Sequence, residues 1–77
     1  MMRIAPNPTL DGWITISASG STSLGFVAVH DARGATATVR AERMGAMWRI
    51  LLPDAPGAYF IRMSVEGEEV VKRVLRP

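Results

Sequence analysis

Apolar and β-branched residues in this chain fall into short segments separated by glycine- and proline-rich breaks. The segment from residue 58 to residue 65 shows this most clearly, since every second side chain in it is large and apolar. These side chains are Tyr59, Ile61, Met63 and Val65. Successive side chains of a strand point to opposite faces, so the pattern predicts a strand with one buried face. No segment has the apolar spacing of a long helix.

Turn signals divide the rest of the chain in the same way and predict seven short strands. The strands are expected at residues 3–5, 13–18, 24–30, 35–43, 47–52, 58–65 and 68–75. Tight turns are expected at Asp31-Ala32-Arg33-Gly34 and at Glu66-Gly67, and a polar loop at residues 19–23. The connections are mostly of hairpin length. The pattern therefore favours an all-β fold, a seven-stranded antiparallel immunoglobulin-like β-sandwich, with a small barrel as the alternative.

Three of these segments carry specific expectations about the two faces of a strand. In residues 13–18, Ile14 and Ile16 share one face. In residues 24–30, strict alternation puts Val27 and Val29 on one face and Phe26 and Ala28 on the other. In residues 35–43, the apolar positions are Ala35, Ala37, Val39 and Ala41.

Composition allows one small globular domain spanning residues 1–77 and excludes several classes of protein. The chain has 77 residues, of which 48% are hydrophobic and 21% charged. It has no cysteine, which excludes disulfides, cysteine-ligated zinc and a thiol nucleophile. No run reaches the roughly 18 apolar residues of a membrane helix, and no signal peptide is recognised. The chain is expected to be a small cytosolic protein or a domain of a longer exported one.

The chain offers no set of residues that fits a catalytic or metal-binding motif. His30, the only histidine, is followed by Asp31, and neighbours on a strand point to opposite faces, so they form no dyad. The segment from Gly20 to Gly25 has the glycine spacing of a phosphate loop but lacks its Lys and hydroxyl residues. Glu66, Glu68 and Glu69 cluster at a turn without the oxygen-rich loop that calcium prefers. The sequence predicts a non-catalytic protein without a metal or cofactor.

The basic residues do not indicate a nucleic-acid-binding protein. The formal net charge is only +2, and the arginines are spread over several predicted strands. Binders of single-stranded nucleic acid pair such charges with exposed aromatic rings. Here the aromatic side chains are expected in or beside the core: Phe26, Trp48, Tyr59 and Phe60.

Four motifs in a fixed order resemble a known family. They are Pro6-Asn7-Pro8-Thr9 followed by Gly12 and Ile14-Thr15-Ile16; residues 27–34, Val-Ala-Val-His-Asp-Ala-Arg-Gly; residues 52–62, Leu-Pro-Asp-Ala-Pro-Gly-Ala-Tyr-Phe-Ile-Arg; and residues 70–77, Val-Val-Lys-Arg-Val-Leu-Arg-Pro. Together, over residues 4–77, they resemble the C-terminal sorting domain of type IX secretion (Por secretion) in the Bacteroidota. Ala5, His30 and the last three residues depart from the family's common pattern.

The resemblance implies an immunoglobulin-like C-terminal domain of a larger exported protein. Such a protein enters the periplasm, and its C-terminal domain is then recognised by the outer-membrane translocon of the type IX machinery. A sortase-like peptidase complex usually removes the domain and joins the cargo to anionic lipopolysaccharide at the cell surface. In some components of the machinery a similar domain is retained. The resemblance thus implies a sorting signal for export to the cell surface, outer membrane or medium.

The last predicted strand is the expected recognition site. A terminal strand at a sheet edge offers unpaired backbone groups to which a partner, or a second copy of the chain, can add a strand. The expected contact residues are Lys72, Arg73, Val74, Leu75 and Arg76, with the three cations as the strongest candidates because folding gives little reason for them. The alternative is that these charges protect an edge from aggregation. The family-motif residues expected to be structural are Pro6, Asn7, Pro8, Gly12, Asp31, Gly34, Gly57 and Tyr59.

Two other classes of function remain open from the sequence. One is a fibronectin-like spacer or a carbohydrate-binding module of a secreted protein. A carbohydrate binder needs coplanar exposed aromatic rings, for which Trp13 and Trp48 are the candidates. The other is a self-standing cytosolic β-domain.

Overall fold

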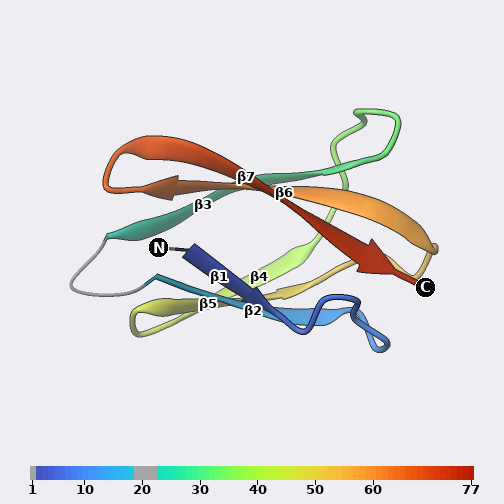
Figure 1. The fold of residues 1–77 in the computed structure, drawn as a ribbon, viewed down its shortest axis with the longest axis horizontal. Coiled ribbons are helices and arrows are strands. Elements are labelled where there is room, and N and C mark those ends of the chain that lie inside the picture. Colours follow the sequence, from blue (N-terminus) through green and yellow to red (C-terminus); the bar gives the residue numbers. More distant parts are fainter. Residues whose placement is uncertain (1, 19–22) are drawn as a thin grey trace.

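The computed structural model describes residues 2–18 and 23–77 and shows an all-β fold in two antiparallel sheets (Figure 1). The described residues contain no helix. The strands are β1 (Met2–Ala5), β2 (Trp13–Ala18), β3 (Leu24–Asp31), β4 (Arg40–Met44), β5 (Met47–Leu51), β6 (Gly57–Val65) and β7 (Glu68–Arg76). The larger sheet has the order β1-β2-β5-β4 and the smaller sheet the order β3-β6-β7. The predictions of an all-β class and of two antiparallel sheets are therefore confirmed.

Hairpins form within each sheet, and longer connections cross between the sheets. Neighbouring strands β1 and β2, β4 and β5, and β6 and β7 pair antiparallel. The chain crosses between sheets after β2, β3 and β5. Figure 1 shows the smaller sheet above the larger one, with the last strand, β7, at an outer edge. This crossing pattern brings β7 close to the connection between β1 and β2, which lies far away in sequence.

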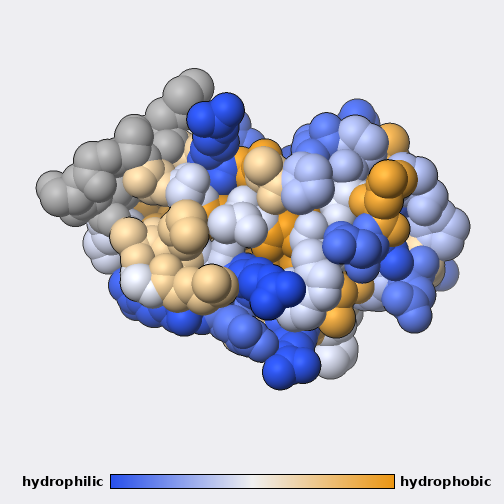
Figure 2. Space-filling model, turned by 90° about the horizontal axis from the view of Figure 1, so that it is seen from below, coloured by the Kyte–Doolittle hydropathy of each residue, from blue (hydrophilic) through white to orange (hydrophobic). Residues whose placement is uncertain are grey.

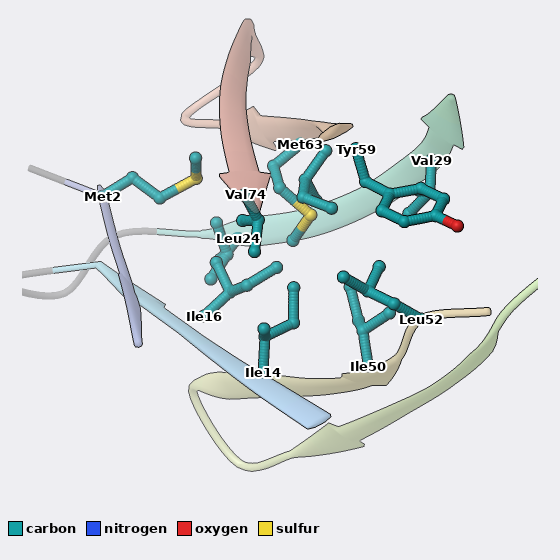
Figure 3. Close-up of a cluster of buried hydrophobic side chains, with 11 residues drawn as sticks. Met2, Ile14, Ile16, Leu24, Val29, Ile50, Leu52, Tyr59, Met63 and Val74 are labelled. Atoms are coloured by element: carbon teal, nitrogen blue, oxygen red, sulfur yellow. The ribbon is translucent and has the colours of Figure 1, made fainter. Parts of the chain in front are cut away.

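The core lies between the two sheets and consists of apolar side chains from both (Figure 3). The alternation predicted for β2 and β6 is confirmed, since Ile14 and Ile16 are buried, as are Tyr59, Ile61 and Met63. The remaining buried apolar residues are Met2, Leu24, Val29, Ile50, Leu52 and Val74. Burial of aliphatic side chains contributes about 1.5–3 kcal/mol each, so this shared cluster is what holds the sheets together.

Strand β3 departs from the predicted alternation. Its register against β6 shifts between Phe26 and Ala28, which is a β-bulge at Val27. Val27 is 48% exposed, whereas Val29 is 1% exposed, so the expectation that they share a face is wrong. A bulge inserts one extra residue, and side chains beyond it change face. Leu24 and Phe26 face the core before the bulge, and Val29 does so after it.

The strand predicted at residues 35–43 is the largest error in the secondary structure. Only Arg40–Met44 forms β4. Residues 35–37 instead continue the turn beside β3, where Ala37 N–H donates to the Val29 carbonyl at 2.8 Å and Thr36 bridges His30. The chain then crosses to the larger sheet. Ala37 and Val39 pack against the core during this crossing, and that gives the segment a strand-like apolar pattern without strand pairing.

The two predicted turns are confirmed. Gly34 N–H donates to the Asp31 carbonyl at 3.0 Å. Glu66 and Gly67 have φ angles of 53° and 82°, as a two-residue hairpin of type I′ requires. The loop predicted at residues 19–23 falls mostly on residues 19–22, which lie outside the described residues.

Candidate functional site on strand β7

Strand β7, the predicted recognition segment, is an edge strand of the smaller sheet. It pairs with β6 along its whole length, from Glu68 opposite Val65 to Arg76 opposite Gly57. Its other edge faces away from β6 and has no full strand beside it among the described residues. The placement of β7 at an edge is what strand addition by a partner would require.

Alternation along β7 divides the predicted contact residues into two groups. Val74 points into the core and has no exposed surface, so its expected role as a surface contact is wrong (Figure 3). Arg73 and Leu75 point to the outer face of the smaller sheet, and both are exposed. Val71 lies on that same outer face and is 52% exposed, although the sequence reading did not select it.

Arg76 ties the end of β7 to two loops instead of lying free in solvent. Its side chain is only 11% exposed. Its Nη1 donates to the Leu10 carbonyl at 3.2 Å, and its Nη2 lies 3.5 Å from the Asp54 carboxylate. Because folding uses this guanidinium, the expectation that folding gives little reason for Arg76 is wrong. Its Nε is buried and has no hydrogen-bond partner among the described residues.

Gly12 lies directly against the Arg76 side chain. A Cβ at this position would lie 2.9 Å from Arg76 Nη1 and 3.3 Å from the Leu52 carbonyl oxygen. Its φ angle of +87° is also in the region that favours glycine. Glycine therefore suits this position for two reasons: its backbone conformation, and the close approach of the Arg76 side chain and the Leu52 carbonyl.

The free edge of β7 is partly occupied by the segment between β1 and β2. The Asn7 side-chain amide accepts from Leu75 N–H and donates to the Arg73 carbonyl, each at 3.1 Å. Thr9 N–H donates to the Leu75 carbonyl at 3.0 Å. Asn7 thus substitutes for a peptide group of a neighbouring strand. The expectation of a fully unpaired edge is wrong for the second half of β7.

Thr9 anchors this segment in the interior. Thr9 is fully buried, and its hydroxyl donates to the Trp13 carbonyl at 2.9 Å. Asp11 then accepts from Trp13 N–H at 2.9 Å and closes the turn into β2. Pro6 and Pro8 flank Asn7 and are exposed, as expected for a connector. The segment is therefore held at a fixed place beside β7.

The first half of β7 keeps an open edge. Backbone groups of alternate residues in an antiparallel strand point the same way, so those of Glu69 and Val71 face outward with those of Arg73 and Leu75. No backbone partner for Glu69 or Val71 on this side is found among the described residues. Lys72 lies two residues before Val74 and points to the same side of β7, but its side chain is exposed. A cation at such a position opposes edge-to-edge pairing.

Several other family-motif residues make contacts or adopt backbone conformations that belong to the fold. The Asp31 carboxylate accepts from Arg33 N–H at 2.9 Å and Ala35 N–H at 3.0 Å. Partial desolvation raises the pKa of Asp31, but these two hydrogen bonds and the Arg33 guanidinium outweigh it and lower the pKa below 3.8. Tyr59 is buried, and its hydroxyl donates to the Ala55 carbonyl at 2.7 Å. Gly34 and Gly57 have φ angles of +87° and +142°, which suit glycine.

One shallow hollow of about 240 Å³ lies between the turn after β3 and the loop before β6. Asp31, Arg33, Pro56, Gly57 and Tyr59 are among the residues that line it. Its polar groups are already engaged, since the Asp31 carboxylate caps its own turn and the Tyr59 hydroxyl bonds Ala55. The hollow therefore presents no converging set of groups for a ligand.

His30 and the two tryptophans are also placed by the structure. His30 Nε2 lies 3.4 Å from Arg62 Nη1 on the outer side of the smaller sheet. Trp13 lies on the outer face of β2, whereas Trp48 shares the core-side parity of Ile50 and donates from Nε1 to the Leu24 carbonyl at 2.9 Å. The two rings are on opposite faces of the larger sheet. They do not form the coplanar platform that a carbohydrate binder would need.

Residues 2–18 and 23–77 contain neither a candidate metal cluster nor a candidate membrane helix. No group of three or more His, Cys, Asp or Glu residues there could hold a metal ion. No helix long and apolar enough to cross a membrane occurs in that part of the chain.

Comparison with known proteins gives the chain no family assignment. A scan against protein-family models returns no match, and a search of curated proteins returns no significant match.

Proposed function

We propose that the chain is an immunoglobulin-like sorting domain of a type IX secretion substrate or machinery component, and that the machinery recognises it through β7. The domain is not an enzyme in this proposal. It directs an attached protein across the outer membrane to the cell surface or medium. The resemblance of the four ordered motifs is the sequence basis of the proposal.

Two features of the fold support the immunoglobulin-like part. The orders β1-β2-β5-β4 and β3-β6-β7 correspond to the A-B-E-D and C-F-G sheets of constant-type immunoglobulin domains. The Tyr59 hydroxyl, near the start of β6, bonds the backbone of Ala55 in the preceding loop. This is the position and contact of the tyrosine corner that many such sandwiches share.

One observation carries the recognition part: β7 is an edge strand whose first half is open. Val71 and Arg73 are exposed on the outer face of β7, and Lys72 is exposed on the opposite side of the strand. A partner strand can pair with the outward backbone groups of Glu69 and Val71. Because the side chains of such a strand alternate between the two faces, its acidic residues can contact Lys72 on one face and Arg73 on the other. Arg76 and Val74 are left out of the contact because both are engaged in folding.

The test is a secretion assay with the whole chain, residues 1–77, fused behind a periplasm-targeted fluorescent protein in a bacterium that has type IX secretion. Deleting β7 is a poor variant because it removes the buried Val74 and would unfold the domain. The double change Lys72→Glu/Arg73→Glu alters only exposed side chains. We expect the parent fusion to reach the surface or medium and this variant to accumulate in the periplasm.

The matched control is Arg33→Glu/Arg43→Glu, which reverses the same amount of charge at exposed positions away from β7. It should be secreted like the parent. Periplasmic retention of all three fusions, with folded domains by protease resistance, would contradict the sorting function and favour a spacer. Equal secretion of all three would contradict recognition through the two cations.

A further inference from the structure

The outer face of the larger sheet has a composition that the proposed sorting role does not use. Alternation against the buried Ile14, Ile16 and Ile50 defines which residues belong to it. They are Arg3, Ala5, Trp13, Thr15, Ser17, Arg40, Glu42, Met44, Met47, Arg49 and Leu51. Figure 2 views the molecule from this side and shows strongly hydrophilic side chains next to apolar ones.

Positive charge is concentrated on this face. It carries three arginines and one glutamate, an excess of two charges that equals the formal net charge of the chain, +2. Arg40 pairs with Glu42 at 2.9 Å. Arg3 and Arg49 make no ion pair with any described residue. The face therefore attracts an anionic partner.

An exposed apolar tip lies on the same face. Met44 and Met47 lie directly opposite each other at the end of the β4–β5 hairpin. They are 48% and 39% exposed and flank the Gly45–Ala46 turn. Methionine side chains adapt to irregular apolar surroundings and are common on binding surfaces. A soluble polyanion would gain nothing from these two side chains, whereas lipid would.

The aromatic residue of the face is arranged as at a membrane interface. Cζ of Arg49 lies 3.8 Å from the centroid of the Trp13 ring, which is a cation–π contact, and the guanidinium makes no ion pair with a described residue. Arginine side chains can lay their stems along apolar surface and keep the charge among headgroups. Tryptophan is favoured at the same depth. The face thus combines exposed apolar side chains, a tryptophan and arginines, as do surfaces that bind at a membrane interface.

We propose that the outer face of the larger sheet binds an anionic lipid surface, with the methionine tip entering the boundary between headgroups and acyl chains. Arg3 and Arg49 contact the anionic headgroups from the same face. This site is separate from β7, which belongs to the other sheet. It stands or falls independently of the sorting function.

The experiment measures binding of the whole chain to vesicles by co-sedimentation. We expect binding to vesicles of equal parts phosphatidylcholine and phosphatidylglycerol, and none to phosphatidylcholine alone. Raising the salt from about 0.1 M to about 1 M, which shortens the Debye length from about 10 Å to about 3 Å, should release most of the protein. A blue shift of tryptophan emission on binding should report Trp13 entering the interface.

Two variants test the two components of the face. Met44→Ser/Met47→Ser should weaken binding about tenfold, since it removes the apolar area that would be buried. Arg49→Gln should weaken it about fivefold, the effect of one basic residue near an anionic surface. Both keep the fold intact because the changed side chains lie outside the core. Unchanged thermal melts by circular dichroism verify this.

The matched controls are Val71→Ser and Arg73→Gln, the same kinds of change on the outer face of the smaller sheet. They should bind like the parent. Equal binding to neutral vesicles would overturn the proposal. The proposal would also be overturned if Met44→Ser/Met47→Ser bound the anionic vesicles as well as the parent does and heparin competed with this binding. The face would then bind a soluble polyanion. Self-association of the free chain that is lost in the methionine variant would assign the face to a dimer instead.

Discussion

The two halves of β7 belong to one continuous strand but have different environments. The first half, Glu68–Lys72, is paired on one side only and exposes Val71 and Lys72. The second half, Arg73–Arg76, is held on both sides: by β6 on one and by Asn7 and Thr9 on the other. The difference shows that an edge strand can be both a structural member of the core and an open template. It also means that substitutions only a few residues apart in β7 should act in different ways.

The largest expected difference lies between Val74 and Val71. Val74→Ala removes methyl groups from a fully buried site and should lower the free energy of unfolding by about 2–3 kcal/mol. Val71→Ala, at an exposed site, should change it by less than about 0.5 kcal/mol. Urea denaturation of both variants measures this. Equal losses would mean that the two halves are equally packed, against the structure.

The next largest difference is expected between two arginines of the second half. Arg76→Gln should lower the free energy of unfolding by about 1–3 kcal/mol, because the loop carbonyl of Leu10 loses its donor and a packed side chain is shortened. Arg73→Gln, which removes an exposed charge, should be nearly neutral. Gly12→Ala should also destabilise the protein, because its Cβ would displace the Arg76 guanidinium and its φ angle of +87° disfavours alanine. If both arginine variants were as stable as the parent, the contacts of Arg76 with the two loops would not contribute to stability.

Asn7 allows a test of the hydrogen bonds that cover the edge of β7 in its second half. Asn7→Ala removes two hydrogen bonds to β7 and should destabilise the protein by about 1 kcal/mol. Hydrogen exchange gives the sharper measurement. The Leu75 amide should be protected in the parent and exchange much faster in the variant, while the Val71 amide should exchange fast in both. A protected Val71 amide in the parent would show that the first half is not open.

Lys72 is expected to affect association more than stability. Lys72→Val removes the charge that opposes edge pairing on the open half, so the variant should form dimers or larger species. Thermal stability at low concentration should stay close to that of the parent. Analytical ultracentrifugation over a range of concentrations separates the two effects. If the Lys72→Val protein stayed monomeric, Lys72 would not be the residue that prevents edge-to-edge pairing at β7.

The smallest effect is expected from a turn that lies outside both halves of β7. The pKa of Asp31 is lowered by its turn, so the ionised carboxyl stabilises the fold. This contribution is complete above the ordinary value of 3.8 and is lost as the pH falls below it, through the pKa of the folded protein. Asp31→Asn should remove this part of the acid sensitivity. Thermal melts between pH 7 and pH 2 should show a smaller decline for the variant than for the parent.

Sequence reasoning was most successful where one face of a strand is buried and pairing is local. The alternation of β2 and β6 was predicted because burial imposes a period of two on hairpin-forming segments. It failed at Val27, where a bulge shifts the faces, and at residues 35–39, where a crossing segment is apolar without being paired. Both failures have one cause: the local pattern records burial, whereas register depends on the neighbouring strand.

For the candidate site, the sequence located the strand but not the state of its residues. Lys72, Arg73 and Arg76 are chemically similar, and nothing in the spacing separates an exposed guanidinium from one packed under Gly12. Asn7 lies 66 residues from Arg73, so no local pattern could indicate that its amide covers the edge of β7.

The sequence by itself determined the class of fold, the positions of most strands, two tight turns and the buried face of the central strands. These features depend on backbone preferences and on burial within a few residues. Only the tertiary structure decided that the first half of β7 has an open edge and that Arg76 ties this strand to two loops. It also decided which apolar side chains share the outer face of the larger sheet with Arg3 and Arg49. These properties arise where strands distant in the chain meet, because there a side chain's role depends on what packs against it.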